Sequence, residues 1–358
     1  MARKVREVAI EGDLYEERDE LLPFQYSITA YGADYPVDGL VRRIQDGDIH
    51  VPDFQRGYVW TPKKASRFIE SLLLGLPVPG IFLSRESDSN RLLVIDGQQR
   101  LRTLQWFYEG VFPPTRKLFA LTDVQKQFVG LTYKTLPDED RRRLDDSIIH
   151  ATIVRQDEPS QDNSSIYYLF ERLNTGGTLL EPQEIRASIY HGKLQDLISS
   201  LNRNTVWREI YGPISPRLRD QELILRFLAL LNESDKYRTP IKEFLNDYMG
   251  RHRNPAPREI DRLMRTFEDT IELVGECLGT KAFKPKRTLN AAVFDSVMVG
   301  VARRLAVKHA PSCTTLKQAY DSLLADTEYA SLVSRTTANQ ERVRRRLELA
   351  TGAFAATL

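Results

Sequence analysis

The spacing of apolar residues changes along this chain, and the change falls near residue 163. Before it, short apolar runs typical of strands (27–32, 81–84, 91–96 and 148–154) are mixed with segments of helical spacing. After it, nearly every segment repeats its apolar residues at helical spacing, and no internal repeat of fixed period is present. We therefore expect an α+β protein with a mixed N-terminal core followed by a mainly helical domain.

Three parts follow from this pattern. Residues 1–22 are highly charged and lack periodic apolar spacing, so they are expected to form a flexible charged arm. Residues 23–160 hold the strand-like runs and segments of helical spacing at 37–49, at 62–74 and after residue 100, and form the expected α+β domain. Residues 161–358 form the expected helical domain.

Composition excludes several classes of protein. No stretch approaches about 18 consecutive apolar residues, so no membrane-spanning helix and no membrane partner are predicted. The first twenty residues lack the apolar core of a secretory signal, which favours a soluble, cytoplasmic protein. Because the cysteines are limited to Cys277 and Cys313, neither a disulfide framework nor a cysteine-based zinc site is expected.

Charge is distributed unevenly. Residues 1–200 hold 25 Lys and Arg against 30 Asp and Glu, whereas residues 201–358 hold 26 against 19. The basic second half fits a nucleic acid or an acidic partner, and it fits a set of solvated helices equally well. Charge alone does not decide between them.

The strongest local motif is RLLVIDGQQRLRTL at residues 91–104. A buried strand ends at Asp96, Gly97 permits a tight turn, and a helix begins at once. The first N–H groups of such a helix are unpaired and suit a phosphate, and Arg100 can add a bidentate contact. The alternative is an ordinary Asp-Gly turn that leads into an amphipathic helix.

Two further segments contain residue types that could bind a ligand. VPDFQRGYVW (51–60) interleaves aromatic residues with Gln55 and Arg56, a pattern that suits base stacking or, alternatively, a packed core. FERLNTGGTLLEPQEIR (170–186) contains a polar, glycine-rich turn that can offer backbone N–H groups to an anion or serve as an ordinary loop. No Walker A, nucleophile-elbow or zinc-protease motif is present, and the five histidines are scattered.

These three segments, in this order, resemble the DGQQR family, the N-terminal specificity-subunit family of GmrSD-type modification-dependent restriction systems. The matching residues are PDFQRGYVW (52–60), GLPVP (75–79), DGQQRL (96–101) and FERLNTGGT (170–178), with weaker likeness at 222–230, 242–249 and 289–298. The resemblance covers most of residues 30–310.

This resemblance implies a ParB/sulfiredoxin-like core that binds, and often hydrolyses, nucleoside triphosphates. It implies a catalytic site of Asp96, Gln98, Gln99 and Arg100, with Asp96 as ligand of a Mg²⁺ cofactor. The nucleotide-binding residues implied in addition are Gln55, Arg56, Gly97, Asn174, Thr175, Gly176 and Gly177.

The sequence departs from the family pattern in two ways. Arg102 stands where relatives often have threonine, and it either adds positive charge or faces solvent. No HNH-type nuclease motif follows the helical part, so we expect a stand-alone member that acts with a separate HNH-type or HEPN-type effector nuclease.

The expected function is therefore that of a nucleotide-binding, NTP-hydrolysing sensor subunit of a prokaryotic anti-phage system. Two alternatives stay open. One is a DNA-binding protein with weak ParB-like nuclease activity, and the other is a non-enzymatic inhibitor or scaffold for a toxin partner. The exposed helical half also offers a surface for an oligomer.

Overall fold

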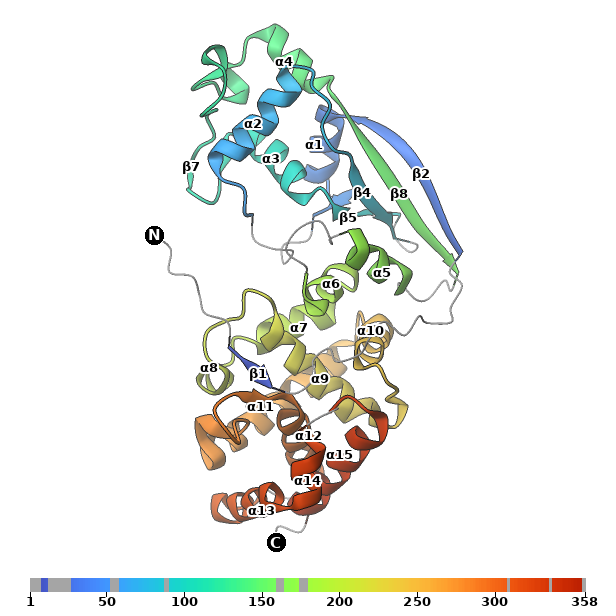
Figure 1. The fold of residues 1–358 in the computed structure, drawn as a ribbon, viewed down its shortest axis with the longest axis vertical. Helices are drawn as coiled ribbons and strands as arrows, with labels where there is room; N and C mark the ends of the chain where they lie inside the picture. The colour runs from blue at the N-terminus through green and yellow to red at the C-terminus, as the bar shows by residue number, and fades with distance from the viewer. Residues whose placement is uncertain are drawn as a thin grey trace. The chain divides into compact units, whose positions relative to one another are not determined.

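The computed structural model describes residues 8–11, 27–51, 58–86, 90–158, 164–173, 180–307, 310–334 and 337–355. The chain divides into two compact units (Figure 1). The first is Phe24–Leu180, and the second joins Met1–Pro23 to Glu181–Leu358. The division falls after Leu180, later in the chain than the boundary expected at residue 160. A mixed sheet in the first unit and a mainly helical second unit confirm the α+β expectation.

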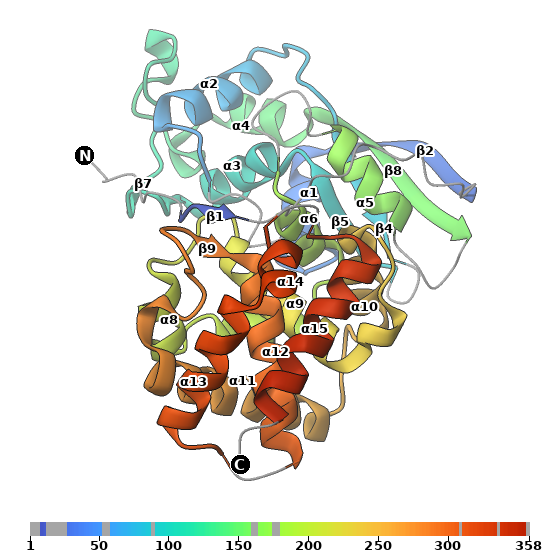
Figure 2. The same cartoon turned by 60° about the horizontal axis from the view of Figure 1, so that its bottom comes forward.

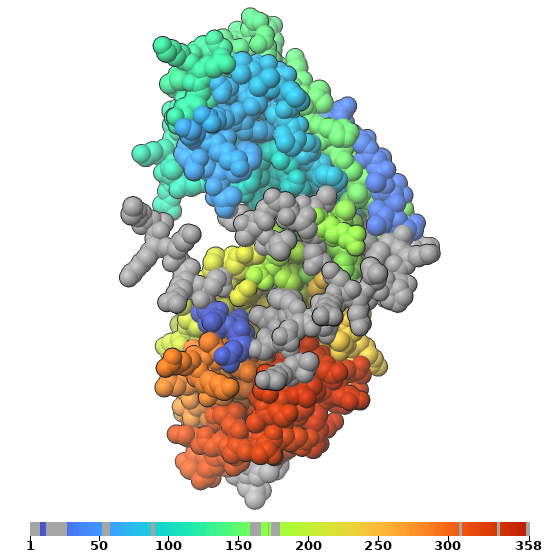
Figure 3. Space-filling view, viewed as in Figure 1, coloured from blue at the N-terminus to red at the C-terminus, as the bar shows by residue number. Residues whose placement is uncertain are grey.

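The first unit is built on a five-stranded mixed sheet with the order β2-β8-β4-β5-β3. β2 pairs antiparallel with β8 and β4 antiparallel with β5, whereas β4–β8 and β3–β5 are parallel pairs. The edge strand β2 runs beside β8 along the margin of this unit (Figure 3). The strands are β2 (Ser27–Pro36), β3 (Ile49–His50), β4 (Ile81–Arg85), β5 (Leu92–Asp96), β8 (Ile148–Glu158) and the separate hairpin β6 (Val111–Phe112) and β7 (Lys117–Leu118).

Helices cover both faces of this sheet. In β5, Leu92 and Val94 belong to the core formed with the first four helices. Successive strand residues point to opposite faces, so the buried Leu93 and Ile95 face the other side, where α5 contacts β5. The helices are α1 (Val37–Gln45), α2 (Pro62–Leu73), α3 (Gln98–Glu109), α4 (Asp138–Asp145) and α5 (Ser164–Leu173).

The second unit is helical, and α12 lies among its other helices (Figure 2). All residues of α12 from 291 to 302 are buried. α12 packs against α15 so closely that a Cβ atom at Gly300 would lie 2.8 Å from the Phe354 ring. The helices of the second unit are α6 (Pro182–Ile189), α7 (Lys193–Leu201), α8 (Thr205–Tyr211), α9 (Arg219–Glu233), α10 (Ile241–Arg251), α11 (Pro257–Leu278), α12 (Ala291–Val307), α13 (Cys313–Ala325), α14 (Thr327–Leu332) and α15 (Gln340–Ala355).

Two features of this unit were not expected from the sequence. Within the proposed N-terminal arm, β1 (Ile10–Glu11) pairs in parallel with β9 (Leu289–Asn290), while residues 1–7 and 12–22 lie outside the described residues. Cys277 at the end of α11 and Cys313 at the start of α13 form a disulfide, with their Cα atoms 4.6 Å apart. In the described part of the chain, no helix combines the length and the apolar character needed to cross a membrane.

Candidate functional site

The turn between β5 and α3 is fixed by a glycine that no other residue can replace without strain. Gly97 has φ 103°, a left-handed conformation that side-chain-bearing residues rarely adopt. A Cβ atom there would also lie 2.4 Å from Cγ2 of Ile81, the first residue of β4. The positive φ of Gly97 agrees with the tight turn predicted there. The close approach to Ile81 shows that the turn packs directly against β4.

Arg100 ties this turn to the start of β4. Its Nη2 donates to Oδ2 of Asp96 at 2.8 Å and to the carbonyl oxygen of Gly80 at 2.9 Å. The side chain of Arg100 is 14% exposed, whereas that of Asp96 is 45% exposed. In the described structure, the guanidinium thus makes internal contacts, while part of the carboxylate faces solvent.

Gln99 joins the two strongest sequence motifs. Its Oε1 accepts hydrogen bonds from the backbone N–H groups of Val59, at 3.0 Å, and Trp60, at 3.3 Å. These two residues end the aromatic segment 51–60, and Gln99 belongs to the DGQQR segment. The sequence alone does not show that the two segments are in contact.

A second set of contacts anchors the same aromatic segment on α3. The hydroxyl oxygens of Tyr58 and Thr103 lie 2.6 Å apart, and the ring centres of Tyr58 and Trp106 lie 4.4 Å apart. Burial raises the pKa of Tyr58 to about 12, and the hydrogen bond with Thr103 offsets part of this rise. Arg102 donates to the carbonyl oxygen of Val51 at 3.0 Å, so its side chain makes a structural contact. α3 therefore holds the residues on both sides of segment 52–57.

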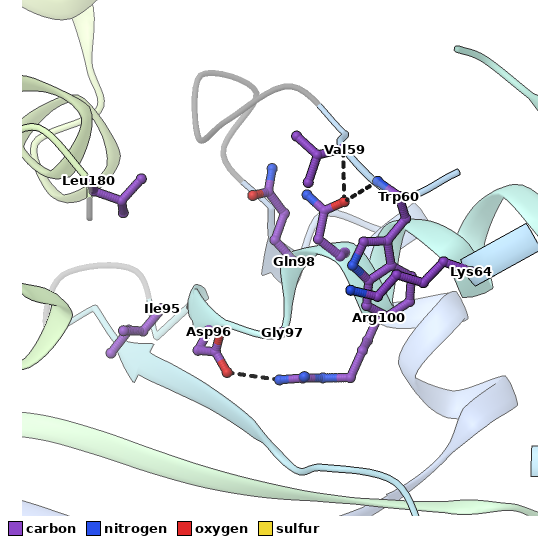
Figure 4. Close-up of a pocket in the computed structure, with 10 residues that line it drawn as sticks. Val59, Trp60, Lys64, Ile95, Asp96, Gly97, Gln98, Arg100 and Leu180 are labelled. Atoms are coloured by element: carbon purple, nitrogen blue, oxygen red, sulfur yellow. Dashed lines mark hydrogen bonds and ion pairs between the residues drawn. The ribbon is translucent and has the colours of Figure 1, made fainter. Parts of the chain in front are cut away.

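A pocket of about 310 Å³ opens at this turn (Figure 4). Gln98 and the Arg100 guanidinium extend to different sides of the turn, and Lys64 lies beside Trp60. The Lys64 ammonium is 4.9 Å from the centre of the Trp60 ring. The lining residues are Val59, Trp60, Lys64, Ile95, Asp96, Gly97, Gln98, Gln99, Arg100 and Leu180.

The N-terminus of α3 lies in this pocket. Gly97 is the N-cap, and no described side chain caps the helix or places a carboxylate in its first turn. The first N–H groups of a helix lack intrahelical partners, and the helix dipole gives them partial positive charge. Together with Lys64 and the amide of Gln98, this end of α3 provides donors that suit an anionic group.

The structure brings several of the predicted site residues together. The pocket at the β5–α3 turn is lined by Asp96, Gly97, Gln98, Gln99 and Arg100. The other predicted residues, Gln55, Arg56, Asn174, Thr175, Gly176 and Gly177, lie outside the described residues.

Sequence reasoning missed Lys64, although its position carries a signal. Lys63 and Lys64 fall in the first turn of α2, where the helix dipole disfavours cations. Two consecutive lysines after the Thr61 N-cap are therefore unfavourable for the stability of the helix alone.

Metal ligands are sparse around the pocket. Within the described residues, no group of three or more His, Cys, Asp or Glu side chains is placed to hold a metal ion. Among the lining residues that the structure describes, Asp96 is the one carboxylate. A Mg²⁺ ion held here by Asp96 would take its other oxygen ligands from water or from a bound phosphate.

The fold and the site define an α+β domain whose strand-to-helix turn opens into a polar pocket. Residues 37–191 match the family model of the GmrSD restriction endonuclease N-terminal domain. This part of the chain is thus similar to the N-terminal domain of GmrSD restriction endonucleases, which confirms the resemblance over residues 37–191.

A relative among curated proteins is similar over a smaller region. An uncharacterized protein of Methanocaldococcus jannaschii is 31% identical over 116 residues. The match covers 26% of this chain and 19% of that protein. The aligned region is thus about a fifth of the relative's length, and the relative's name states no activity.

Proposed function

We propose that the pocket at the β5–α3 turn binds a nucleoside triphosphate and that the chain hydrolyses it as the sensor subunit of a restriction-like anti-phage system. The observation that carries this proposal is the convergence on one pocket of Gln98, the cationic side chain of Lys64 and a helix N-terminus that no described side chain caps. Such a combination favours a polyphosphate over a neutral ligand. The family match supports a role in restriction, where the sensor would regulate a separate HNH-type or HEPN-type effector nuclease.

The residues of the turn would divide the work. Gln98 and the first N–H groups of α3 would bind phosphate oxygens, and Asp96 would orient a water molecule or hold Mg²⁺ together with those oxygens. A bound Mg²⁺ would supply neutralisation of phosphate charge. Catalysis would then rest on positioning and charge stabilisation. From the family resemblance, Gln55, Arg56 and the segment Asn174–Gly177 would complete the nucleotide site.

Isothermal titration calorimetry against the four common nucleoside triphosphates with Mg²⁺ tests this function. Gln98→Ala is the informative variant, because Gln99 and Arg100 also hold the turn together. Gln105→Ala is its matched control: Gln105 lies on the same helix, outside the pocket, and donates to Glu109 at 2.9 Å. We expect Gln98→Ala to weaken binding about tenfold, the value of one hydrogen bond to a charged group, and Gln105→Ala to leave it unchanged.

A chain that binds no nucleoside triphosphate would contradict the proposal. DNA binding that weakens steeply with salt would then favour the DNA-binding alternative, because phosphate contacts release counterions. Nucleotide-independent complex formation with a toxin partner would instead favour the scaffold alternative. Phosphate release by the wild-type chain, measured in the same samples, separates hydrolysis from binding alone.

A further inference from the structure

We infer that Lys64, and not Arg100, supplies the cation that binds the phosphate groups in this pocket. This inference rests on the proposed function, since the ligand it concerns is a nucleoside triphosphate. It assigns a binding role to a residue outside the DGQQR segment and gives Arg100 a positioning role.

The charges around the pocket are the first reason. Its lining includes three charged side chains: Lys64, Asp96 and Arg100. Asp96 and Arg100 form an ion pair at 2.8 Å, so their charges largely cancel. Among the described lining residues, the positive charge that remains to attract an anion is that of Lys64.

The contacts of Arg100 are the second reason. Nη2 already donates to both Asp96 and the Gly80 carbonyl, and the side chain is largely buried. For Nη2 of Arg100 to turn toward a phosphate, both bonds would break and the turn would lose its link to β4. Arg100 therefore acts on the ligand through the geometry of the turn.

The surroundings of Lys64 are the third reason. Among the described residues, Lys64 forms no ion pair, whereas its neighbour Lys63 pairs with Asp123 at 3.3 Å. The side chain of Lys64 is exposed, and its ammonium lies over the ring of Trp60, which also lines the pocket. A cation in the first turn of α2 is opposed by the helix dipole, so binding an anion would relieve an unfavourable arrangement.

A chain of contacts connects the DGQQR segment to Lys64. Gln99 accepts from the N–H of Trp60 and so fixes the backbone at that residue. The Trp60 ring packs edge-on against Phe68, with ring centres 5.6 Å apart, and its face carries the Lys64 ammonium. Gln99 is thus a positioning residue that acts on Lys64 through Trp60.

The test compares Lys64→Gln with Lys63→Gln, which removes the same charge from the adjacent position. Calorimetry would use inorganic tripolyphosphate and the nucleoside triphosphate that the wild-type chain binds most tightly. We expect Lys64→Gln to weaken binding of both probes about tenfold or more and to reduce the dependence of binding on salt concentration. Lys63→Gln should bind both probes like the wild type, and thermal unfolding should show that both variants are folded.

Each other outcome is decisive. If the wild type binds the nucleotide and Lys64→Gln binds it equally well, the inference is wrong while the proposed function stands. Equal losses in Lys64→Gln and Lys63→Gln would also overturn it, because they would indicate general attraction rather than a contact. If the wild type binds neither probe, both the proposed function and the inference are wrong.

Discussion

Two structural features require glycine at position 97: a left-handed backbone conformation and close packing against Ile81. Its φ of 103° is strained for any residue with a side chain, and Ile81 occupies the space that a Cβ atom would need. We expect Gly97→Ala to lower the free energy of unfolding by about 2–4 kcal/mol, the sum of a left-handed conformation and a steric clash. Urea denaturation followed by circular dichroism measures this change.

Gly47→Ala separates the two contributions. Gly47 has φ 79°, but a Cβ atom there would meet nothing within 4 Å. Its replacement should cost about 1 kcal/mol, from the backbone conformation alone. Equal losses at the two positions would show that contact with Ile81 contributes nothing to the cost at Gly97.

For single residues, the sequence predicts the backbone conformation that a position requires better than it predicts which other residues that position contacts. The need for a tight turn at Gly97 follows from a strand that runs directly into a helix. The bond from Arg100 to the Gly80 carbonyl spans 20 positions of the chain, and the bond from Val59 to Gln99 spans 40. Such contacts depend on how strands and helices pack, and local periodicity holds no information about them.

Elements with a clear apolar period were predictable. Helices α1 and α2 and strands β4, β5 and β8 lie within or close to the ranges that the apolar spacing predicts. Helix α4 was missed because its sequence, DEDRRRLD, buries a single residue, Leu144, and so shows no period. The two-residue strand β3 is too short to have one. The strand order and the mixed directions are non-local and could not be read from the sequence.

A buried cluster of charges joins three helices of the second unit. Asp295 on α12 accepts two hydrogen bonds from Arg226 on α9, at 3.0 and 2.6 Å, and one from Arg346 on α15, at 3.0 Å. All three side chains are almost fully buried. Burial opposes the charged form of Arg226, but the charge and hydrogen bonds of Asp295 outweigh this effect and raise the pKa of Arg226.

We expect Asp295→Asn to lower the free energy of unfolding by about 3–5 kcal/mol, because two buried guanidinium groups lose their shared counter-charge. Urea denaturation gives the value. The control is Glu328→Gln, which neutralises a carboxylate that Arg345 binds at 2.7 and 3.0 Å on the exposed surface. Solvent screens that pair, so the control should unfold like the wild type. An Asp295→Asn variant with an unchanged urea midpoint would show that the cluster does not stabilise the fold.

For the molecule as a whole, chain length and cysteine count predict less about the structure than the spacing of apolar residues does. Two cysteines separated by 36 positions carry no pattern that distinguishes a bonded pair from two free thiols. Their pairing follows from the packing of α11 against α13, which is again a non-local property. The expected cytoplasmic location stays a prediction, and a reducing cytoplasm would tend to open this bond.

The disulfide makes the stability of the chain depend on redox conditions. Closing a loop of 36 residues restricts the unfolded chain, which corresponds to about 3–4 kcal/mol in the loop-entropy description. We expect the oxidised wild type to have a higher urea midpoint than the same protein in excess dithiothreitol. The control is the double variant Cys277→Ala and Cys313→Ala, which contains no cysteine and should show one midpoint, close to that of the reduced wild type, in both conditions. Because the variant removes the bond without a reductant, coincident midpoints for the variant and the oxidised wild type would show that the disulfide does not stabilise the helical unit.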